Sequence, residues 1–164
     1  MEFEFVELLK QSVGGEILIT LVVSMLPVVE LRGAIPIGVA MGLPLWVALL
    51  ASIIGNMIPV PFIIVFIRKI FAFIRRHSPK LEKLVSRLEA RAVSKQETVE
   101  KYKFWGLMIF VAIPLPGTGA WTGALIAAMM DMRIKRALPS IFVGVVVAGI
   151  LITGLTYGFT AIFA

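Results

Sequence analysis

Two ionisable side chains inside an apolar stretch near the N-terminus are the strongest candidates for chemistry in this chain. Glu30 and Arg32 lie two residues apart within residues 27–36, which contain no other ionisable side chain. An ionisable side chain inside a membrane costs about 2.5–3.5 kcal/mol on insertion scales and is by default a functional candidate. Burial disfavours a charged glutamate and a nearby arginine favours it, which leaves room for proton coupling. The planar guanidinium of Arg32 suits a phosphate or a carboxylate. The alternative is a structural ion pair that closes a hairpin tip, or an ordinary outer loop.

A second apolar stretch, residues 104–130, is interrupted by the sequence Pro-Leu-Pro-Gly-Thr-Gly. Its prolines and glycines free backbone groups and admit close approach, its threonine offers a hydroxyl, and the tryptophan just after it can wall a cavity. A half-helix that begins near residue 120 would point backbone N–H donors towards an anion. The candidate binding residues of this segment are Pro114, Pro116, Gly117, Thr118, Gly119 and Trp121. The alternative is a crossing helix that is kinked by proline and packed through glycine.

Two further residues complete the candidate set for binding substrate or protons. Pro36 ends the segment that carries Glu30 and Arg32. Asn56 is the strongly polar side chain of the apolar stretch 45–67. Its amide can point into a binding cavity or form a hydrogen bond to another helix, and the sequence leaves both open.

The composition is that of a membrane protein. Apolar residues make up 59% of the 164 residues, and the mean hydropathy is +0.98, values that exclude an ordinary soluble domain. Cysteine is absent and the single histidine lies in a basic segment, so we expect no metal, no cofactor and no disulfide. The sequence contains no nucleophile–base pair and no phosphate loop, so we expect no enzyme. The positive charge lies beside apolar stretches, which favours anionic lipid over nucleic acid as a partner.

The positions of the basic residues predict how residues 104–130 lie in a membrane. Basic segments precede and follow this stretch, and positive charge marks the cytoplasmic side. The halves 104–113 and 120–130 would each reach only about 15 Å as helices, half of a ~30 Å hydrocarbon core. The stretch therefore predicts a re-entrant helical hairpin that enters and leaves by the same side.

Along the whole chain, the order of basic and apolar segments predicts an all-α integral membrane protein built as an inverted repeat. Repeat one, residues 16–67, would consist of an interrupted hairpin at 16–43 and a transmembrane helix at 45–67. A cytoplasmic linker at 68–103 carries eleven lysines and arginines against four glutamates. Repeat two, residues 104–162, would consist of the second hairpin and a transmembrane helix at 137–162. Residues 1–164 then form one membrane domain, which begins with a short amphipathic helix at 1–13.

The linker itself predicts an amphipathic helix. Ser78 and Pro79 are suitable for its cap and first position, and apolar residues then recur at helical spacing, namely Leu81, Leu84, Val85, Leu88 and Ala92. That stripe can pack on the protein or lie on the membrane surface. Secondary transporters with inverted repeats bind substrate near the midplane, where broken helices meet. We therefore expect the two hairpin tips to face each other across a polar cavity.

Two stretches resemble the signature sequences of a known family. They are Glu-Leu-Arg-Gly-Ala-Ile-Pro at 30–36 and Pro-Leu-Pro-Gly-Thr-Gly-Ala-Trp-Thr-Gly at 114–123, and they are similar to those of bacterial and archaeal small multidrug export proteins. More distantly, the chain resembles the DedA superfamily, whose members have two opposed re-entrant hairpins and are implicated in moving phospholipids or undecaprenyl phosphate with proton-motive force. This resemblance implies that Glu30 matches the acidic residue of the first hairpin. DedA proteins also carry arginines around the second hairpin, which residues 114–119 lack, so Arg32 would have to supply the positive charge.

Three functions are compatible with these features. The first is a proton-coupled transporter that moves a lipid phosphate or another amphipathic small molecule across or between leaflets. The second is a drug/proton antiporter that exports lipophilic cations, and the third is a structural or assembly membrane protein. The expected partners are membrane lipids, the amphipathic substrate and further copies of the chain through its glycine-rich last helix. The expected location is a prokaryotic plasma membrane, crossed several times.

Overall fold

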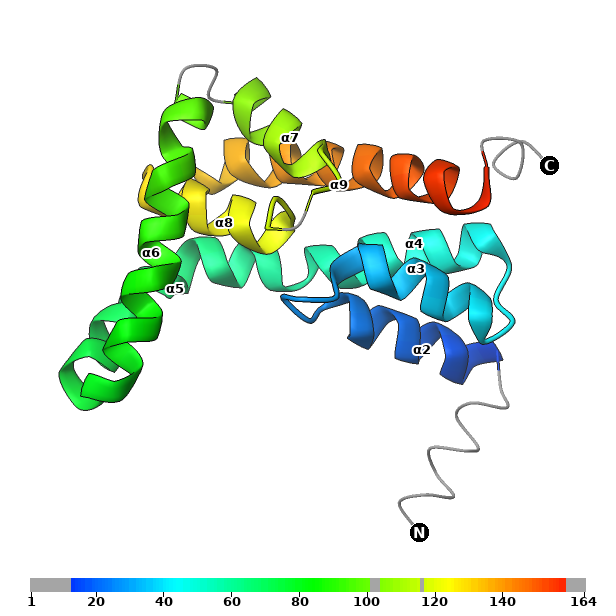
Figure 1. Ribbon diagram of the computed structural model, residues 1–164, viewed down its shortest axis with the longest axis horizontal. Coiled ribbons are helices and arrows are strands. Elements are labelled where there is room, and N and C mark those ends of the chain that lie inside the picture. The colour runs from blue at the N-terminus through cyan, green and yellow to red at the C-terminus, as the bar shows by residue number, and fades with distance from the viewer. Residues whose placement is uncertain (1–12, 101–103, 116, 159–164) are drawn as a thin grey trace, which may run out of the picture. The chain divides into compact units, whose positions relative to one another are not determined.

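The computed structural model describes residues 13–100, 104–115 and 117–158, and their regular secondary structure is helical (Figure 1). This confirms the predicted all-α class. The helices are α2 (Val13–Ser24), α3 (Glu30–Ala40), α4 (Leu45–Met57), α5 (Pro59–His77), α6 (Pro79–Glu100), α7 (Phe104–Ala112), α8 (Ala120–Met129) and α9 (Ile134–Tyr157). The amphipathic helix predicted at 1–13 falls almost wholly outside the described residues.

The chain divides into two compact units. Unit 1 comprises Met1–Ile58 and Val145–Ala164, and it contains α2, α3, α4 and the later part of α9. Unit 2 comprises Pro59–Gly144, and it contains α5 to α8 and the beginning of α9. The repeat boundaries at 16–67 and 104–162 are not tested by this division and stay a prediction.

The predicted transmembrane helix at 45–67 belongs to a longer helical stretch. Among the described residues, the 33-residue run Leu45–His77 and α9 are long and apolar enough to cross a membrane. Pro59 interrupts the run and begins α5, a position where the missing N–H of proline leaves no helical bond unmade. At 1.5 Å per residue, α4 reaches about 20 Å and α5 about 29 Å, against a hydrocarbon core of ~30 Å. The helix continues past Arg68 to His77, so the predicted crossing ends inside a helix and not at a helix end.

Both interrupted stretches form helical hairpins. Residues 25–29 join α2 to α3, and residues 113–119 join α7 to α8. The four helices have 12, 11, 9 and 10 residues, so each is about 14–18 Å long, well short of a full crossing. Short paired helices are what the sequence predicted. The re-entrant path and the inverted repeat describe the protein in a bilayer and stay predictions.

Small residues set the packing of unit 1, in which α2, α3 and α4 lie side by side (Figure 1). A Cβ on Gly55 of α4 would lie 2.2 Å from the backbone oxygen of Leu21 on α2, a distance that real Cβ atoms do not adopt. Nearby, the Ser24 hydroxyl of α2 donates a hydrogen bond to the backbone oxygen of Ser52 on α4. Glycine therefore lets two helices approach closely, and a buried serine ties them together.

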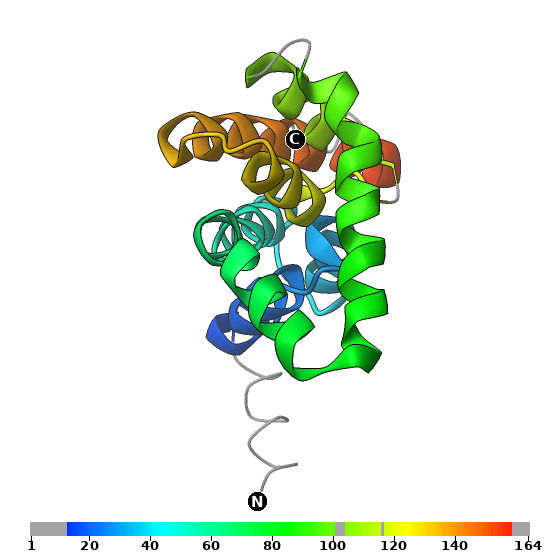
Figure 2. The same cartoon turned by 90° about the vertical axis from the view of Figure 1, so that its left-hand side faces the viewer.

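The linker helix α6 packs on α5, α7 and α8 in unit 2, and it crosses α8 steeply in both views (Figures 1 and 2). It begins at Pro79, as predicted, and the N–H groups of Leu81 and Glu82 donate to the backbone oxygen of Ser78 at 3.1 Å. Part of the predicted stripe packs on the protein, and contact of the rest with a membrane surface stays a prediction. Val85 and Ala92 are buried and Leu88 is half-buried, whereas Leu81 and Leu84 are exposed.

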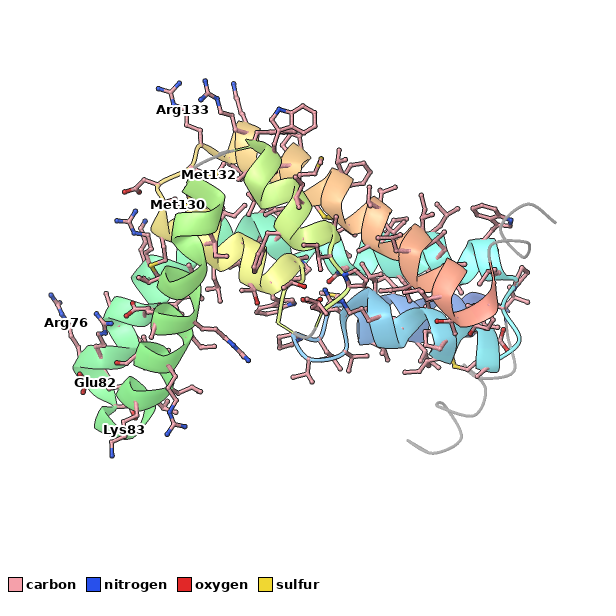
Figure 3. The ribbon with its side chains drawn as sticks, turned by 45° about the horizontal axis from the view of Figure 1, so that its top comes forward. Arg76, Glu82, Lys83, Met130, Met132 and Arg133 are labelled. Atoms are coloured by element: carbon pink, nitrogen blue, oxygen red, sulfur yellow. The ribbon has the colours of Figure 1, made fainter. Side chains whose placement is uncertain are left out.

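Charged residues of unit 2 gather where its helices turn. Arg76, Glu82 and Lys83 project outward from the α5–α6 turn, and Arg133 does so near the start of α9 (Figure 3). Two exposed ion pairs, Arg75 with Glu89 and Arg68 with Asp131, join α5 to α6 and to the α8–α9 turn. Exposed pairs of this kind contribute little stability.

Two glycines of α9 are used for packing within the chain. A Cβ on Gly144 would lie 2.7 Å from the backbone oxygen of Met108 on α7, inside unit 2. A Cβ on Gly149 would lie 2.8 Å from the Leu49 side chain on α4, inside unit 1. The glycines that favoured a homo-oligomer therefore have another role, and association with further copies stays a prediction.

Candidate functional site

Glu30 is a buried acid with an unusual backbone conformation. It is the first residue of α3, its exposed fraction is 6%, and its φ of 50° lies in the left-handed region that glycine favours. A non-glycine residue in such a conformation costs of order 1–3 kcal/mol, and this kind of strain collects at functional sites. The N–H of Glu30 donates to the backbone oxygen of Leu26 at 2.9 Å, which joins the tip to α3. Burial, an ionisable group and backbone strain thus coincide at one residue.

Arg32 and Pro36 share α3 with Glu30. The guanidinium of Arg32 is half-buried and interacts electrostatically with the Glu30 carboxylate. Pro36 is half-buried inside the helix, where it removes one backbone donor. The sequence had placed all three residues in a hairpin tip at 27–36. The tip is instead formed by residues 25–29, and the candidate residues lie on the helix that follows it, because the chain turns at Pro27 and is helical from residue 30.

Asn56 lies in the last turn of α4 and is completely buried. Within the described chain, neither its Oδ1 nor its Nδ2 has a hydrogen-bond partner. The hydroxyl of Ser52, one turn earlier on the same helix, is buried in the same way. The amide is thus buried without a hydrogen bond to a described residue, and whether it lines a binding cavity stays a prediction.

The packing of α3 on α4 places Glu30 and Asn56 at the same position along the two helix axes. Gly38 of α3 contacts Ala48 of α4, and the short connection between these helices makes them antiparallel. Eight residues back along α3 from Gly38 is Glu30, and eight residues forward along α4 from Ala48 is Asn56. Because both helices rise 1.5 Å per residue, these two residues lie at the same distance along the helix axes from the Gly38–Ala48 contact.

The second tip is held in shape by its own backbone and by Thr118. The hydroxyl of Thr118 is 2.6 Å from the backbone oxygen of Ile113 and 2.8 Å from that of Leu115, and its single proton can donate to either. Gly119 caps α8, which begins at Ala120 as predicted, without a side-chain capping bond. This threonine therefore stabilises the turn. Trp121, in the first turn of α8, is half-buried.

A positive charge reaches this tip from α6, which the sequence reasoning missed. The guanidinium carbon of Arg91 lies 3.7 Å from the position that a Cβ on Gly117 would take. Gly117 has a φ of 82°, a backbone conformation that glycine adopts without strain. Its lack of a side chain also leaves room for the guanidinium of Arg91. The tip residues themselves carry no charge, and this contact brings them a guanidinium from outside residues 114–119; the role expected of Arg32 stays a prediction. A contact between a helix and a loop 26 positions later leaves no local signal in a sequence.

The predicted residues fall into two groups, one in each unit. Unit 1 holds Glu30, Arg32, Pro36 and Asn56. Unit 2 holds Pro114, Gly117, Thr118, Gly119 and Trp121, and Pro116 lies outside the described residues. The expectation that the two tips face each other across a cavity concerns both units and stays a prediction.

Comparison with known proteins gives a family for the chain. A family model matches residues 30–151, which begin at Glu30, include both hairpin motifs and make up most of the chain. No curated protein and no solved structure matched it. Together with the two long apolar helices, the match assigns the protein to a membrane. The chain therefore belongs to the family of membrane proteins described as "Putative small multi-drug export protein".

Proposed function

We propose that the protein is a proton-coupled transporter that moves an anionic amphiphile, such as a lipid phosphate, across or between the leaflets of a prokaryotic plasma membrane. The observation that carries the proposal is the buried and strained Glu30 with Arg32 beside it on a short apolar helix. An acid in this position is costly in a membrane and is by default a functional candidate. The more distant similarity to DedA proteins, which the two motifs suggested, belongs to the same proposal.

Each unit contains an arginine that is suited to an anionic group. Arg32 offers a half-buried guanidinium next to the coupling acid, and Arg91 supplies a second guanidinium at the tip beside Gly117. Planar guanidinium groups bind phosphate through two parallel hydrogen bonds, whereas an ammonium group acts as a point charge. Arg32 is therefore proposed as the headgroup ligand of unit 1, and Arg91 as an anion ligand of unit 2.

Arg32→Lys is expected to weaken transport of a phosphate-bearing lipid although the charge is retained. A lost bidentate contact of about 1.5–3 kcal/mol corresponds to a roughly 10- to 150-fold rise in the apparent Michaelis constant. The measurement is flux of a fluorescent lipid phosphate in proteoliposomes, compared with a lipid of the same chains and an uncharged headgroup. Arg91→Lys tests the second tip in the same way, and the exposed Arg87→Lys on α6 is the matched control. Equal flux of charged and uncharged lipids by the wild type would contradict an anionic substrate.

A reporter that is active only in the cytoplasm is expected to stay silent when fused after Ala164. The proposal puts both termini outside, because the basic residues flank the second hairpin on the cytoplasmic side. The same reporter inserted at Ser78, between α5 and α6, should be active and serves as the control. Four ordinary crossings would instead place residue 164 inside. Activity of the fusion after Ala164 would therefore refute the inverted-repeat orientation.

The second candidate function is a drug/proton antiporter, and the family description favours it. It would use the same buried Glu30, which a lipophilic cation and a proton would occupy in turn. The two candidates differ in how Arg32 acts, because an arginine beside the site attracts an anion and repels a cation. In the same proteoliposomes, Arg32→Gln should slow export of an anion but speed export of a cation. The third possibility, a structural protein, predicts no flux above protein-free liposomes.

A further inference from the structure

Unit 1 buries polar atoms that no described residue satisfies. Ser52 Oγ and both polar atoms of the Asn56 amide lie one helical turn apart on α4 and have no protein partner. Leaving such groups unpaired in an apolar interior is costly, and buried polar groups are nearly always bonded to protein or water. The amide needs an acceptor for its N–H and a donor for its oxygen. Water provides both, whereas a metal ion cannot accept a hydrogen bond from Nδ2.

Along the axes of α3 and α4, Asn56 lies at the same position as Glu30, which is buried in the same unit. No direct hydrogen bond joins Asn56 to the acid, because both amide atoms lack a protein partner. Water can bridge two buried polar groups that lie beyond direct hydrogen-bond distance of each other. A bridge here would end on a carboxylate, which can take up a proton.

The described part of unit 1 contains few other ionisable groups that could act on Glu30. Arg32 is on the same helix, and Glu16 of α2 lies at the opposite end of the hairpin from the tip. The helix α4 has no ionisable side chain, and the later part of α9 has only Tyr157 at its end. A proton that reaches Glu30 through the described part of this unit therefore has to be carried by neutral groups.

We infer that unit 1 holds internal water between Ser52, Asn56 and Glu30, and that this water carries protons to and from the Glu30 carboxylate. The ligand is water and its protonated form. In the uptake step a hydronium ion gives one proton to the carboxylate and becomes water. In the release step the carboxylic acid returns that proton to water. The inference rests on the proposed function, in which Glu30 is the coupling acid.

Infrared difference spectra of the protein in proteoliposomes, between neutral and acidic pH, test the inference. Bands of internal water are those that shift when water labelled with oxygen-18 replaces ordinary water. The band of protonated Glu30 is the one that Glu30→Gln lacks. The wild type should show both bands. Asn56→Leu, which has a similar volume and no polar atom, should lose the water band and move the Glu30 carbonyl stretch to higher frequency, because a hydrogen bond to the acid is lost.

Thr153→Val is the matched control. Thr153 is also buried without a protein partner. It lies one turn beyond Gly149, which packs on Leu49, and α9 runs antiparallel to α4 (Figure 1). It is therefore displaced along α4 away from Asn56, so Thr153→Val should leave the Glu30 band unmoved and keep the water signal that Asn56→Leu removes. Should Asn56→Leu fail to fold, Ser52→Ala takes its place and is expected to weaken the water band.

The possible results separate this inference from the proposed function. An unchanged spectrum in Asn56→Leu overturns the inference, as does a wild type without a water band. Loss of the water band while the Glu30 band stays unmoved also overturns it, and leaves proton coupling intact. A wild type that shows the water band but no Glu30 band overturns the proton-carrying role and proton coupling together.

Discussion

Glu30→Gln is expected to abolish pH-driven transport in proteoliposomes, down to the level of protein-free liposomes. Glutamine has nearly the same shape as glutamate and can form similar hydrogen bonds, but it cannot take up and release a proton. A transport cycle in which Glu30 must be protonated on one side and deprotonated on the other would therefore stop. The measurement is flux across an imposed pH gradient, with folding checked by circular dichroism and insertion by protease protection.

Glu16→Gln is the matched control for this experiment. Glu16 is the other acid among the described residues of unit 1, it is half-buried, and it lies in the first turn of α2 with ordinary helical backbone. The same chemical change there should leave pH-driven flux at the wild-type level. Wild-type flux in Glu30→Gln would show that the acid is structural and would remove the proton from the proposed mechanism.

Gly55→Leu is expected to be the most destabilising single substitution in unit 1. A Cβ at this position would lie 2.2 Å from the backbone oxygen of Leu21, and backbone cannot move aside as a flexible side chain can. Overpacking costs about 1–3 kcal/mol in ordinary cores, and here α2 would also be pushed away from α4, where Ser24 donates to the Ser52 oxygen. We expect a loss of more than about 3 kcal/mol in the free energy of unfolding, measured by thermal or denaturant unfolding in detergent.

Two companion variants show whether the contact with Leu21 is responsible. Gly55→Ala adds only the Cβ, and should cost roughly 1–3 kcal/mol by overpacking, less the ~1 kcal/mol that alanine gains over glycine in a helix. Gly14→Ala meets nothing within 4 Å and should leave stability unchanged or slightly higher. If Gly55→Leu unfolds at the wild-type temperature, the close approach of α2 and α4 does not occur in the protein.

The second hairpin could be predicted from sequence because its signals are local. Proline lacks a donor and glycine accepts the φ of 82° at Gly117, so residues 114–119 cannot continue a helix. The predicted halves at 104–113 and 120–130 agree with α7 and α8 to within a residue. The last helix was also predicted, at 137–162 against an observed Ile134–Tyr157.

Other features depend on contacts that sequence periodicity does not record. The start of α3 at Glu30 has no local signal, because Val29 precedes it without a side-chain cap. The continuation of α5 past Arg68 was missed because a basic residue indicates a membrane surface but is also a good helix former. The approach of Arg91 to Gly117 follows from how α6 crosses its unit. The sequence thus identifies residues that differ from their neighbours in the chain. It does not identify contacts that form only when distant helices pack together.

The left-handed backbone at residue 30 lowers stability, whereas the proposed activity depends on the glutamate that adopts it. Glycine would remove the strain of order 1–3 kcal/mol, and asparagine would reduce it, but neither side chain can exchange a proton near neutral pH. A programme that thermostabilises this membrane protein by relaxing strained positions would therefore choose Glu30 among its first targets. On the proposed function, the more stable protein would then be one that has lost its coupling acid, which is a stability–activity trade-off. Samples prepared for structural work should for this reason retain Glu30, even at the expense of yield.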